Sequence, residues 1–488
     1  MNKKMKSVSI LLIAVLLMAM TFSASAISAT GTSTPAGTTA AGITDSGTTA
    51  TAIGKTYYVS TSGSDSNSGL SLQAPFKTIQ KSANTVKAGD TVFVRGGVYK
   101  ESLTMKNSGT AAAPIQFKGY NGEKPVIDGT GRTVEAGVLI ANKHYIKFIG
   151  FTVCNFISKN EDVIIGISVE GNSKGIEIRD CIVHDIKTTY SKTTMDRNAH
   201  GIAVYGTVPD SNDPIDGLIL DNNEVYRCTL GLSEAVVLNG NVSNFRVTNN
   251  RVHDNDNIGI DFIGFEGTAN DEEEGDSTAM QDRARNGICS GNRVWNISCA
   301  TNPTYEGEGL CADGLYVDGG YNIIIERNIV NNCDIGIEAA SEHYGCTTDR
   351  ITIRNNVVKN CKGVGGISFG GADASENGDA KNIKIINNTL YNNVVQLNIS
   401  NANSSTNSIR NNICYLGEFV SGKIGKNVIS NNLTKNPYFV DEVAGDFRLK
   451  ANSPAIDAGV AADYGTLDLA GNVRLKGKAV DLGAFELK

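Results

Sequence analysis

Short runs of alternating apolar and polar residues recur along most of this chain. Three of them lie close together and share one form, opening on Gly and closing on a small residue: Gly259–Gly264, Gly314–Gly319 and Gly336–Ser341. Alternation with a period of two is typical of a strand with one buried face. The pattern predicts three neighbouring strands whose outer face carries Asp261, Tyr316, Asp318 and Glu338.

A second kind of run alternates with the first and carries an Asn-Asn pair, as in Ile351-Thr-Ile-Arg-Asn-Asn-Val-Val. Units start roughly 20–40 residues apart, which indicates a stacked array. Asn tolerates the left-handed conformation needed at a sharp bend, and asparagines of successive coils can hydrogen-bond to one another. Cys228, Cys333 and Cys361 occupy one recurring position, so we expect them to stack as well. The array is an all-β parallel β-helix.

The chain divides into four segments. Residues 1–26 have a basic start, an apolar run and Ala24-Ser-Ala26, the form of a secretory signal peptide. Residues 27–54 are rich in Thr, Ala, Ser and Gly and form a flexible linker. We expect the β-helix over 55–435, with an amphipathic helix at Pro75–Ala88 capping its first coil, and a C-terminal cap over 436–488.

The composition of the chain limits the kinds of binding partner and the cellular location that we expect. The net charge of −7 argues against nucleic acid, and no later stretch is apolar enough to span a membrane, so a secreted, extracellular monomer is expected. Ten cysteines in a secreted chain suggest disulfides, but their repeat positions favour stacked, buried thiols. A bridge between Cys299 and Cys311 stays open.

Three acids of the first runs form a candidate catalytic floor. In a parallel stack Asp261 and Glu338 lie about 9–10 Å apart along the backbone, with Tyr316 between them and Asp318 about 8 Å from both. Inverting glycosidases hold two carboxyls about 6.5–9.5 Å apart. Exposed strand positions are polar anyway, but other coils place Ser168, Ala203, Val237, Ser368 and Asn398 in this column. We therefore predict that Asp261, Asp318 and Glu338 are catalytic.

Further residues are placed to form the walls of a groove. Substrate-binding roles are expected for Tyr316, His343, Glu342, Glu266, His200 and Tyr205, and Arg285 could reach an anionic sugar. Asp313 also lies at the start of its strand.

The chain resembles the pectin-lyase-like superfamily of right-handed β-helices. The motifs at Tyr58–Gly69 and Ala88–Tyr99 are especially similar to family 9 pectate lyases and related carbohydrate-active proteins. That family has a calcium-binding Asn-x-Asp-Asp-Gly-x-Asp run, which reads Asn255-Asp-Asn-Ile-Gly-Ile-Asp261 here. The resemblance implies metal binding at Glu234 and Asp261, with Ca²⁺ as the candidate cofactor. It also implies that the family's lysine base falls on Tyr316, which puts a lysine-based elimination in doubt.

The resulting hypothesis is a secreted enzyme that cleaves glycosidic bonds of an extracellular, plant cell-wall type polysaccharide, with hydrolysis favoured. One alternative is a Ca²⁺-dependent pectate or uronate lyase. The other is a non-catalytic polysaccharide-binding surface protein, because solenoids often serve as binding surfaces.

Overall fold

The computed structural model describes residues 54–158, 163–189, 198–269, 279–305 and 309–487, which belong to one compact unit, Gly54–Lys488. The signal peptide and nearly all of the linker predicted above lie outside the described residues. Within these ranges, no helix is long and apolar enough to cross a membrane.

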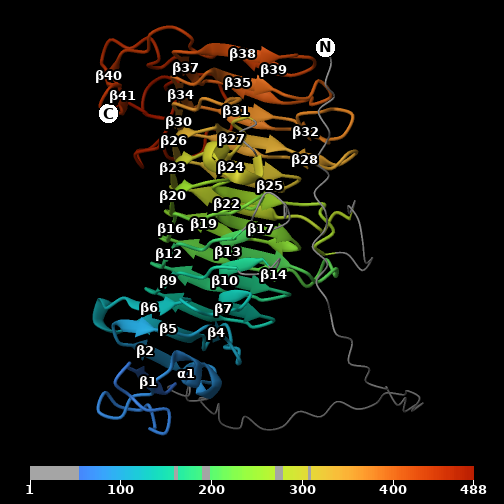
Figure 1. Ribbon diagram of the computed structural model, residues 1–488. Coiled ribbons are helices and arrows are strands. Elements are labelled where there is room, and N and C mark those ends of the chain that lie inside the picture. The colour runs from blue at the N-terminus through green and yellow to red at the C-terminus, as the bar shows by residue number, and fades with distance from the viewer. Residues whose placement is uncertain (1–53, 159–162, 190–197, 270–278, 306–308, 488) are drawn as a thin grey trace, which may run out of the picture. The chain divides into compact units, whose positions relative to one another are not determined.

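Three parallel sheets run along the stack, and each coil contributes short strands to them in turn (Figure 1). Sheet 1 contains β1 (Thr56–Val59), β2 (Thr91–Val94), β5 (Ile115–Gly119), β8 (Ile146–Ile149), β11 (Glu177–Arg179), β14 (Ile215–Asp216), β15 (Ile219–Asp221), β18 (Val242–Ser243), β19 (Arg246–Thr248), β22 (Arg285–Ser290), β25 (Tyr321–Glu326), β28 (Thr347–Asp349), β29 (Thr352–Arg354), β32 (Asp379–Lys381), β33 (Lys384–Ile386), β36 (Ser408–Arg410) and β39 (Val428–Ser430). Sheet 2 contains β4 (Leu103–Thr104), β7 (Ala136–Ala141), β10 (Ile164–Glu170), β13 (Ala199–Gly206), β17 (Val236–Gly240), β21 (Ile260–Ile263), β24 (Asp313–Asp318), β27 (Ile335–Ala340), β31 (Gly365–Phe369), β35 (Val395–Ile399) and β38 (Glu418–Gly422). Sheet 3 contains β3 (Gly97–Tyr99), β6 (Pro125–Asp128), β9 (Thr152–Cys154), β12 (Ile182–His184), β16 (Glu224–Tyr226), β20 (Arg251–Asn255), β23 (Arg293–Ile297), β26 (Ile329–Cys333), β30 (Val357–Lys359), β34 (Thr389–Tyr391) and β37 (Ile413–Tyr415). The predicted parallel β-helix is confirmed.

The Asn-Asn runs divide between sheets 1 and 3, and the two asparagines of a pair do different work. Asn355 takes a φ of 55°, the left-handed conformation that turns the chain out of β29. Asn356 is fully buried and accepts hydrogen bonds at its Oδ1 from the backbone N–H and the Nδ2 of Asn328. The pair therefore bends the coil with its first residue and joins neighbouring coils with its second.

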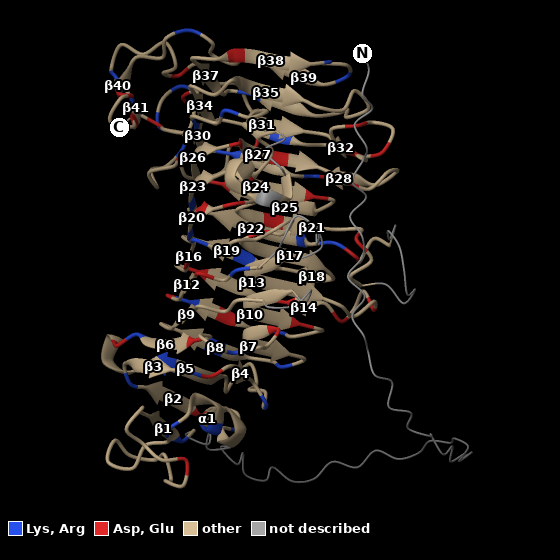
Figure 2. Cartoon of the chain, in the orientation of Figure 1, with Lys and Arg blue, Asp and Glu red and all other residues tan. Residues whose placement is uncertain are grey.

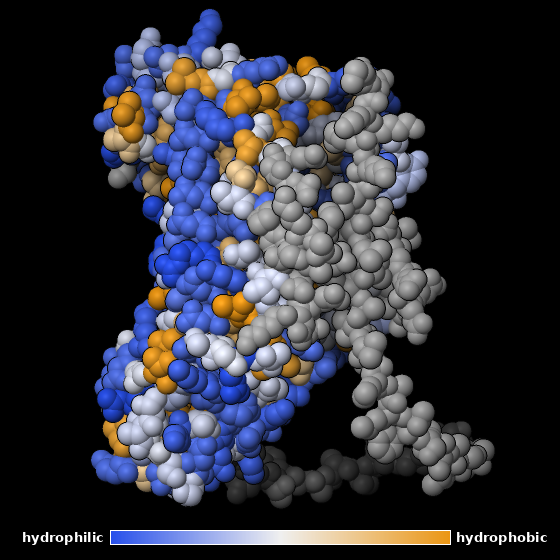
Figure 3. All heavy atoms as spheres, in the orientation of Figure 1, coloured by the Kyte–Doolittle hydropathy of each residue, from blue (hydrophilic) through white to orange (hydrophobic). Residues whose placement is uncertain are grey.

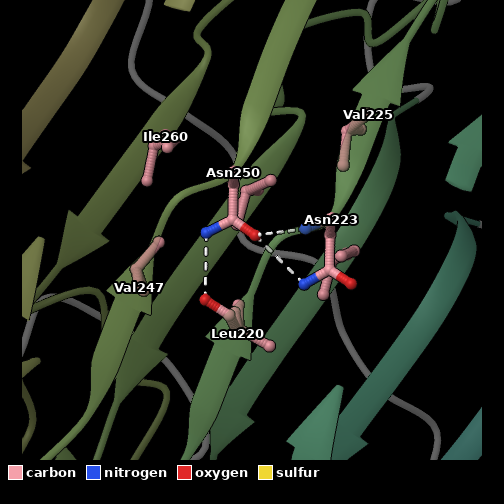
Figure 4. Close-up of a pocket in the computed structure, with 8 residues that line it drawn as sticks. Leu220, Asn223, Val225, Val247, Asn250 and Ile260 are labelled. Atoms are coloured by element: carbon pink, nitrogen blue, oxygen red, sulfur yellow. Dashed lines mark hydrogen bonds between the residues drawn. The ribbon is translucent and has the colours of Figure 1, made fainter. Parts of the chain in front are cut away.

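The second asparagines form a ladder through the interior. Asn250 accepts at Oδ1 from the N–H and Nδ2 of Asn223, and its own Nδ2 donates to the Leu220 carbonyl (Figure 4). The same bonds join Asn223, Asn250, Asn292, Asn328, Asn356, Asn388, Asn412 and Asn432. The small space beside Asn250 is lined by core side chains such as Ile260, so it belongs to the interior rather than to a binding site.

In β24, the inward-facing Gly314 changes the alternation of side chains near the start of the strand. A Cβ at Gly314 would come within 2.6 Å of Val330 and 2.8 Å of the Gly336 carbonyl, so a side chain would not fit. Leu315 and Val317 then point into the core, and Tyr316 points outward, as predicted. Because Gly314 and Leu315 both face inward, Asp313 lies on the same outer face as Tyr316, three residues away.

Both end segments differ in part from the sequence prediction. The helix is α1 (Ile79–Thr85), shorter than Pro75–Ala88, because Thr78 caps its start and Val86 leaves it in an extended conformation. Ile79 and Ala83 are buried in the core beside β1, and α1 lies near the β1 end of the stack in Figure 1, whereas its function as a cap stays a prediction. The other helical elements in the described residues are short 3₁₀ turns: η1 (Tyr120–Gly122), η2 (Cys299–Thr301) and η3 (Pro303–Tyr305).

The segment 436–488 packs along the side of the last coils. It contains the antiparallel pair β40 (Phe439–Asp441) and β41 (Asp446–Leu449). Phe439 and Phe447 form a separate apolar cluster with Val357 of β30 and Ile413 of β37. The outer face of sheet 3 is apolar at these positions, so it needs a lateral cover. These residues cover the side of the last coils, and the closing of the end of the stack by segment 436–488 stays a prediction.

Apolar side chains are scattered over the visible surface rather than gathered in one large area (Figure 3). Val443 and Tyr344 are the most exposed of the large ones in the described residues, at 94% and 70%, and they belong to unconnected segments. The face shown in Figure 3 thus carries no single broad apolar area among the described residues.

Candidate functional site

Three residues of the predicted floor form a row across sheet 2. Asp261 on β21 pairs in register with Tyr316 on β24, which pairs with Glu338 on β27. Neighbouring strands lie about 4.8 Å apart, so the backbones of Asp261 and Glu338 are about 9–10 Å apart. The row continues into Val237 on one side and Ser368 on the other. The structure thus brings Asp261, Tyr316 and Glu338 together as the alternation predicted, and Figure 2 marks acidic positions on the strands of these middle coils.

Asp318 and Asp313 extend the row at the two ends of β24. Asp318 lies two residues beyond Tyr316 and pairs with Ala340, outside the row itself. Asp313 lies at the opposite end, and its Oδ1 has no hydrogen-bond partner in the described part of the chain. We expected an exposed floor, but Asp261, Asp313 and Asp318 are only 2–3% exposed. Glu338 is partly exposed, so the exposure inferred from strand alternation was wrong for the aspartates and not for the whole floor.

Glu342 is the carboxylate that connects the parts of this site. Its backbone N–H donates to Asp318 Oδ1 (2.8 Å), and its Oε1 accepts from the Tyr316 hydroxyl (3.4 Å). Its charge also acts on Asp261 and Asp313. Although Glu342 follows β27 in a loop, its side chain belongs to the same acidic group as the strand residues.

Burial and mutual repulsion raise the pKa values of the whole group. Burial is the first cause for Asp261, Asp313 and Asp318, and the nearby carboxylates add to it, so each pKa lies well above its usual range. Burial raises the pKa of Glu338 to about 7, against the lowering effect of a hydrogen bond from Ser368 (2.9 Å). The group therefore retains protons at neutral pH, which is the condition for a carboxyl group to act as an acid there.

Tyr316 lies in the centre of these charges. Burial raises the pKa of its phenol well above 10, and Asp318, Glu342, Glu338 and Asp261 raise it further because they oppose a phenolate. The phenol consequently stays protonated and acts as a hydrogen-bond donor.

His200 and Tyr205 form a fixed pair on β13, beside Glu234. The Tyr205 hydroxyl donates to His200 Nε2 (2.8 Å), and His200 Nδ1–H donates to the Glu234 carbonyl (3.1 Å). Burial lowers the pKa of His200 to about 4, so the imidazole is neutral. Burial and the charge of Asp261 raise the pKa of Glu234. Strand β13 pairs with β17, and β17 pairs with β21, so His200 and Tyr205 lie two coils from Asp261. Their roles in substrate binding stay a prediction.

The described residues that could share one metal ion are Glu266, Asp318 and His343, whose ligand atoms lie within 4.8 Å of one another. One oxygen of each carboxylate is already held, Glu266 Oε2 by Asn239 Nδ2 (2.6 Å) and Asp318 Oδ1 by Glu342. Imidazole with carboxylates suits Zn²⁺ or Mn²⁺ better than Ca²⁺, which takes oxygen ligands. The expected metal pair, Glu234 and Asp261, is not in this group.

Arg285 lies apart from the carboxylates. It belongs to sheet 1, and its guanidinium donates to the Gln281 and Arg283 carbonyls and to Asn241 Oδ1 (2.8 Å). Its donors are engaged in holding the chain after the β21 strand, so the structure does not bring it to the site as we expected. Nearby Arg283 is only 2% exposed and lies between the rings of Phe265 and Tyr321.

These features define a class of protein: a parallel β-helix with an acidic row on the outer face of one sheet. Residues 57–208 match the family model of the Pel9A-like right-handed β-helix region. The chain belongs to the same family as the uncharacterized protein YwoF of Bacillus subtilis, to which it is 37% identical over 452 residues, covering 82% of this chain and 92% of that protein.

Other similarities are shorter or more distant. A stretch of 74 residues, 15% of this chain and 18% of the other, is 40% identical to pectate lyase PEL9 of Emericella nidulans. Among solved structures, pectate lyase Pel9A aligns with a TM-score of 0.50 at 18% identity, covering 89% of this chain and 96% of that one. The GH136 lacto-N-biosidase of Eubacterium ramulus aligns with 0.54 at 15% identity, covering 78% and 67%. Such identities establish the fold, which lyases and a glycoside hydrolase share.

Proposed function

We propose that the protein is a secreted enzyme that hydrolyses glycosidic bonds of an extracellular, plant cell-wall type polysaccharide. Two solved structures that share its fold are named for activities on carbohydrates, a pectate lyase and a lacto-N-biosidase. The leader-like residues 1–26 support export. The acidic row supplies the side chains that such a reaction needs.

Tyr316 is the observation that favours hydrolysis over elimination. A lyase needs a base that removes a proton from the sugar carbon, and in the family 9 pattern a lysine falls at this position. Tyr316 replaces it with a phenol whose pKa is raised by burial and by four carboxylates. A phenol that holds its proton so firmly is a poor base, whereas Glu338, with its pKa near 7, is a suitable acid at neutral pH.

Glu338 and Asp261 would divide the work of an inverting hydrolysis. Glu338 gives its proton to the leaving glycosidic oxygen as the bond to the anomeric carbon breaks. Asp261 acts in the molecules in which the coupled group has lost one proton from Asp261 while Glu338 keeps its own, and it then accepts a proton from the water whose oxygen forms the new bond on the opposite face. Their backbone separation of about 9–10 Å leaves room for that water. Asp318 shares the proton balance of the group, while Tyr316 and His343 orient the sugar.

A uronate lyase is the second candidate, and the group of Glu266, Asp318 and His343 favours it. A divalent cation held there would offset the repulsion between the acidic row and the carboxylate of a uronate. These ligands suit a transition-metal ion, so a chelator effect would be reversed by Zn²⁺ or Mn²⁺ better than by Ca²⁺.

The two candidates differ in their products. Plant and algal polysaccharides would be digested with chelator, with Ca²⁺ and with Mn²⁺, and new reducing ends and ultraviolet absorbance would both be followed. Hydrolysis gives reducing ends without absorbance, and elimination gives both because it leaves an unsaturated sugar. Retention on a polysaccharide without new ends would establish a binding protein and contradict the proposal. Asp261→Asn and Glu338→Gln should abolish the reducing ends, whereas Ser168→Ala, in the same column of a distant coil, should not.

A further inference from the structure

Two cysteines face each other across the base of the loop that precedes β24. Cys299 and Cys311 have their Sγ atoms 3.4 Å apart, and the Cys311 N–H lies 3.3 Å from the Cys299 sulfur. Cys299 is completely buried and Cys311 is partly exposed. We propose that these two residues form a disulfide in the exported protein. The proposal rests on the export that is part of the proposed function.

Other contacts hold both ends of this loop in place independently of the sulfur atoms. Asp334 Oδ2 accepts hydrogen bonds from the Cys299 N–H (2.9 Å) and from the Ala312 N–H (3.3 Å). Within the loop, Asn302 Nδ2 donates to the Gly231 carbonyl (2.6 Å) and to the Asp256 carbonyl (3.0 Å). The backbone already brings the two cysteines together, so a bridge requires little rearrangement.

The stacked thiols of the core differ from this pair. Cys333 and Cys361 lie in neighbouring coils, as the repeat predicted, because Asn331 pairs with Lys359 two residues before them. Cys228 was expected in the same stack, but Asn255 and Ile297 lie between it and Cys333. Each thiol contacts a carbonyl of its own strand, Asn331 at 3.7 Å and Lys359 at 3.6 Å. Both are shielded in the continuous core, where oxidants have no access. We therefore expect them to remain reduced.

The chemistry is an exchange of thiols for a disulfide. Two S–H bonds break, one S–S bond forms, and two protons and two electrons pass to an oxidant, here the disulfide of a thiol oxidoreductase, which becomes a dithiol. Burial, and then Cys299, raise the pKa of the Cys311 thiol, so little attacking thiolate exists in the folded protein. The bond therefore forms while the chain folds, and burial of Cys299 then protects it from reductants. It is a structural bond rather than a switch.

The bond would stabilise one wall of the acidic site. Tyr305, in the described part of the loop, donates from its hydroxyl to Asn257 Oδ1 (3.3 Å), and the loop leads directly into Asp313. Joining the loop ends limits the movement of Asp313, whose Oδ1 lacks a partner among the described residues.

Mass spectrometry of the exported protein tests the assignment without any substrate. The protein would be unfolded in guanidinium with iodoacetamide, before and after reduction. Of its ten cysteines, we expect two to escape alkylation before reduction, with residues 299 and 311 in one linked peptide. Alkylation of all ten before reduction, or a link between other cysteines, would overturn the proposal. Because no activity is measured, this outcome is independent of whether the enzyme is a hydrolase.

Thermal unfolding gives a second test. A reductant should lower the melting temperature of the wild type by several degrees and leave the double variant Cys299→Ser/Cys311→Ser unchanged. Cys154→Ser, a matched change of a buried cysteine elsewhere, should keep the response of the wild type. An equal response to reductant in wild type and double variant would contradict the bond.

Discussion

Glu338 is the residue whose proposed role as the acid is most easily tested, because the pKa of its carboxyl group, about 7, lies within the pH range of an assay. If it is the acid, activity falls as the pH rises through about 7 and the proton is lost. Glu338→Gln should lower kcat by about 100-fold or more. Ser168→Ala is the matched control. Full activity of the glutamine variant would remove Glu338 from the mechanism.

Ser368 should tune that limb of the pH profile. Its hydroxyl donates to Glu338 Oε1 (2.9 Å) and stabilises the ionised form. Ser368→Ala removes this stabilisation, so the pKa of Glu338 rises and the alkaline limb of the kcat profile moves to higher pH. A structural role alone would lower activity equally at all pH values, and a shift to lower pH would contradict the assignment.

Tyr316→Phe separates the two candidate reactions. In a hydrolase the phenol only donates a hydrogen bond, and its loss should lower kcat by about tenfold. If Tyr316 were the base of a lyase, the loss would be on the order of 1,000-fold or more. Initial rates on the polysaccharide that the panel identifies would decide between them.

Much of the site could be predicted at this scale, because one outer column follows from alternation alone. Asp261, Tyr316 and Glu338 lie as the pattern placed them. Asp313 was recognised only as a wall residue, since the inward pair Gly314-Leu315 breaks the period of two. The sequence did contain a signal for this placement, namely an acidic residue directly before a glycine and an apolar residue, as in Asp313-Gly314-Leu315. The central position of Glu342 depends on a loop conformation that has no sequence period.

The asparagine ladder is the feature that extends across most coils. Asn328→Ala would leave the Asn292 N–H and Nδ2 and the Cys289 carbonyl without their partner in the core. Asn292 Nδ2 keeps its bond to the Val247 carbonyl (2.9 Å), so two buried groups are left unsatisfied. At about 1–3 kcal/mol for each group, the free energy of unfolding should fall by about 2 kcal/mol or more. Asn332→Gly provides a control, because Asn332 is exposed with a φ of 56° that glycine adopts freely.

Urea unfolding measures both variants, and an Asn328→Ala protein as stable as Asn332→Gly would contradict the importance of the ladder. The repeat itself was evident in the sequence because the ladder needs an amide in every coil. The division of each Asn-Asn run between two sheets was less evident. A residue in the left-handed conformation, such as the first asparagine of each pair, can either bend a strand or end it. Packing against the next coil decides which of the two occurs.

At the scale of the whole molecule, burial of the site was the least predictable property. The outer column looks exposed in any strand pattern, yet Asp261 is 2% exposed. Glu266, Tyr305 and Glu342 come from loops of different length between the strands. Loop lengths are visible in a sequence, but the direction in which a loop folds over a sheet is not. The lateral position of segment 436–488 escaped prediction for the same reason.

The buried carboxyls should make the protein most stable in weakly acidic solution. A group whose folded pKa is raised stabilises the fold below its unfolded pKa, and this contribution is lost as the pH rises through the folded pKa. For Glu338 that window runs from about 4.5 to about 7, and the raised pKa values of Asp261, Asp313 and Asp318 extend the loss to higher pH. The melting temperature should therefore be higher at pH 5 than at pH 8.

Two variants, which should change the melting temperature at pH 8 in opposite directions, test whether the buried carboxyl groups cause this pH dependence. Glu338→Gln carries no charge, so it should raise the melting temperature at pH 8 and have little effect at pH 5. Asp185 directly follows β12 of sheet 3 and forms ion pairs with Arg227 and Lys187. These ion pairs stabilise its carboxylate, and its pKa is lowered. Asp185→Asn should therefore lower the melting temperature at pH 8. The contrary result would be a wild type whose melting temperature rises from pH 5 to pH 8, with the same rise in Glu338→Gln. It would show that the negative charge of the acidic row is neutralised in solution, as a bound cation would do.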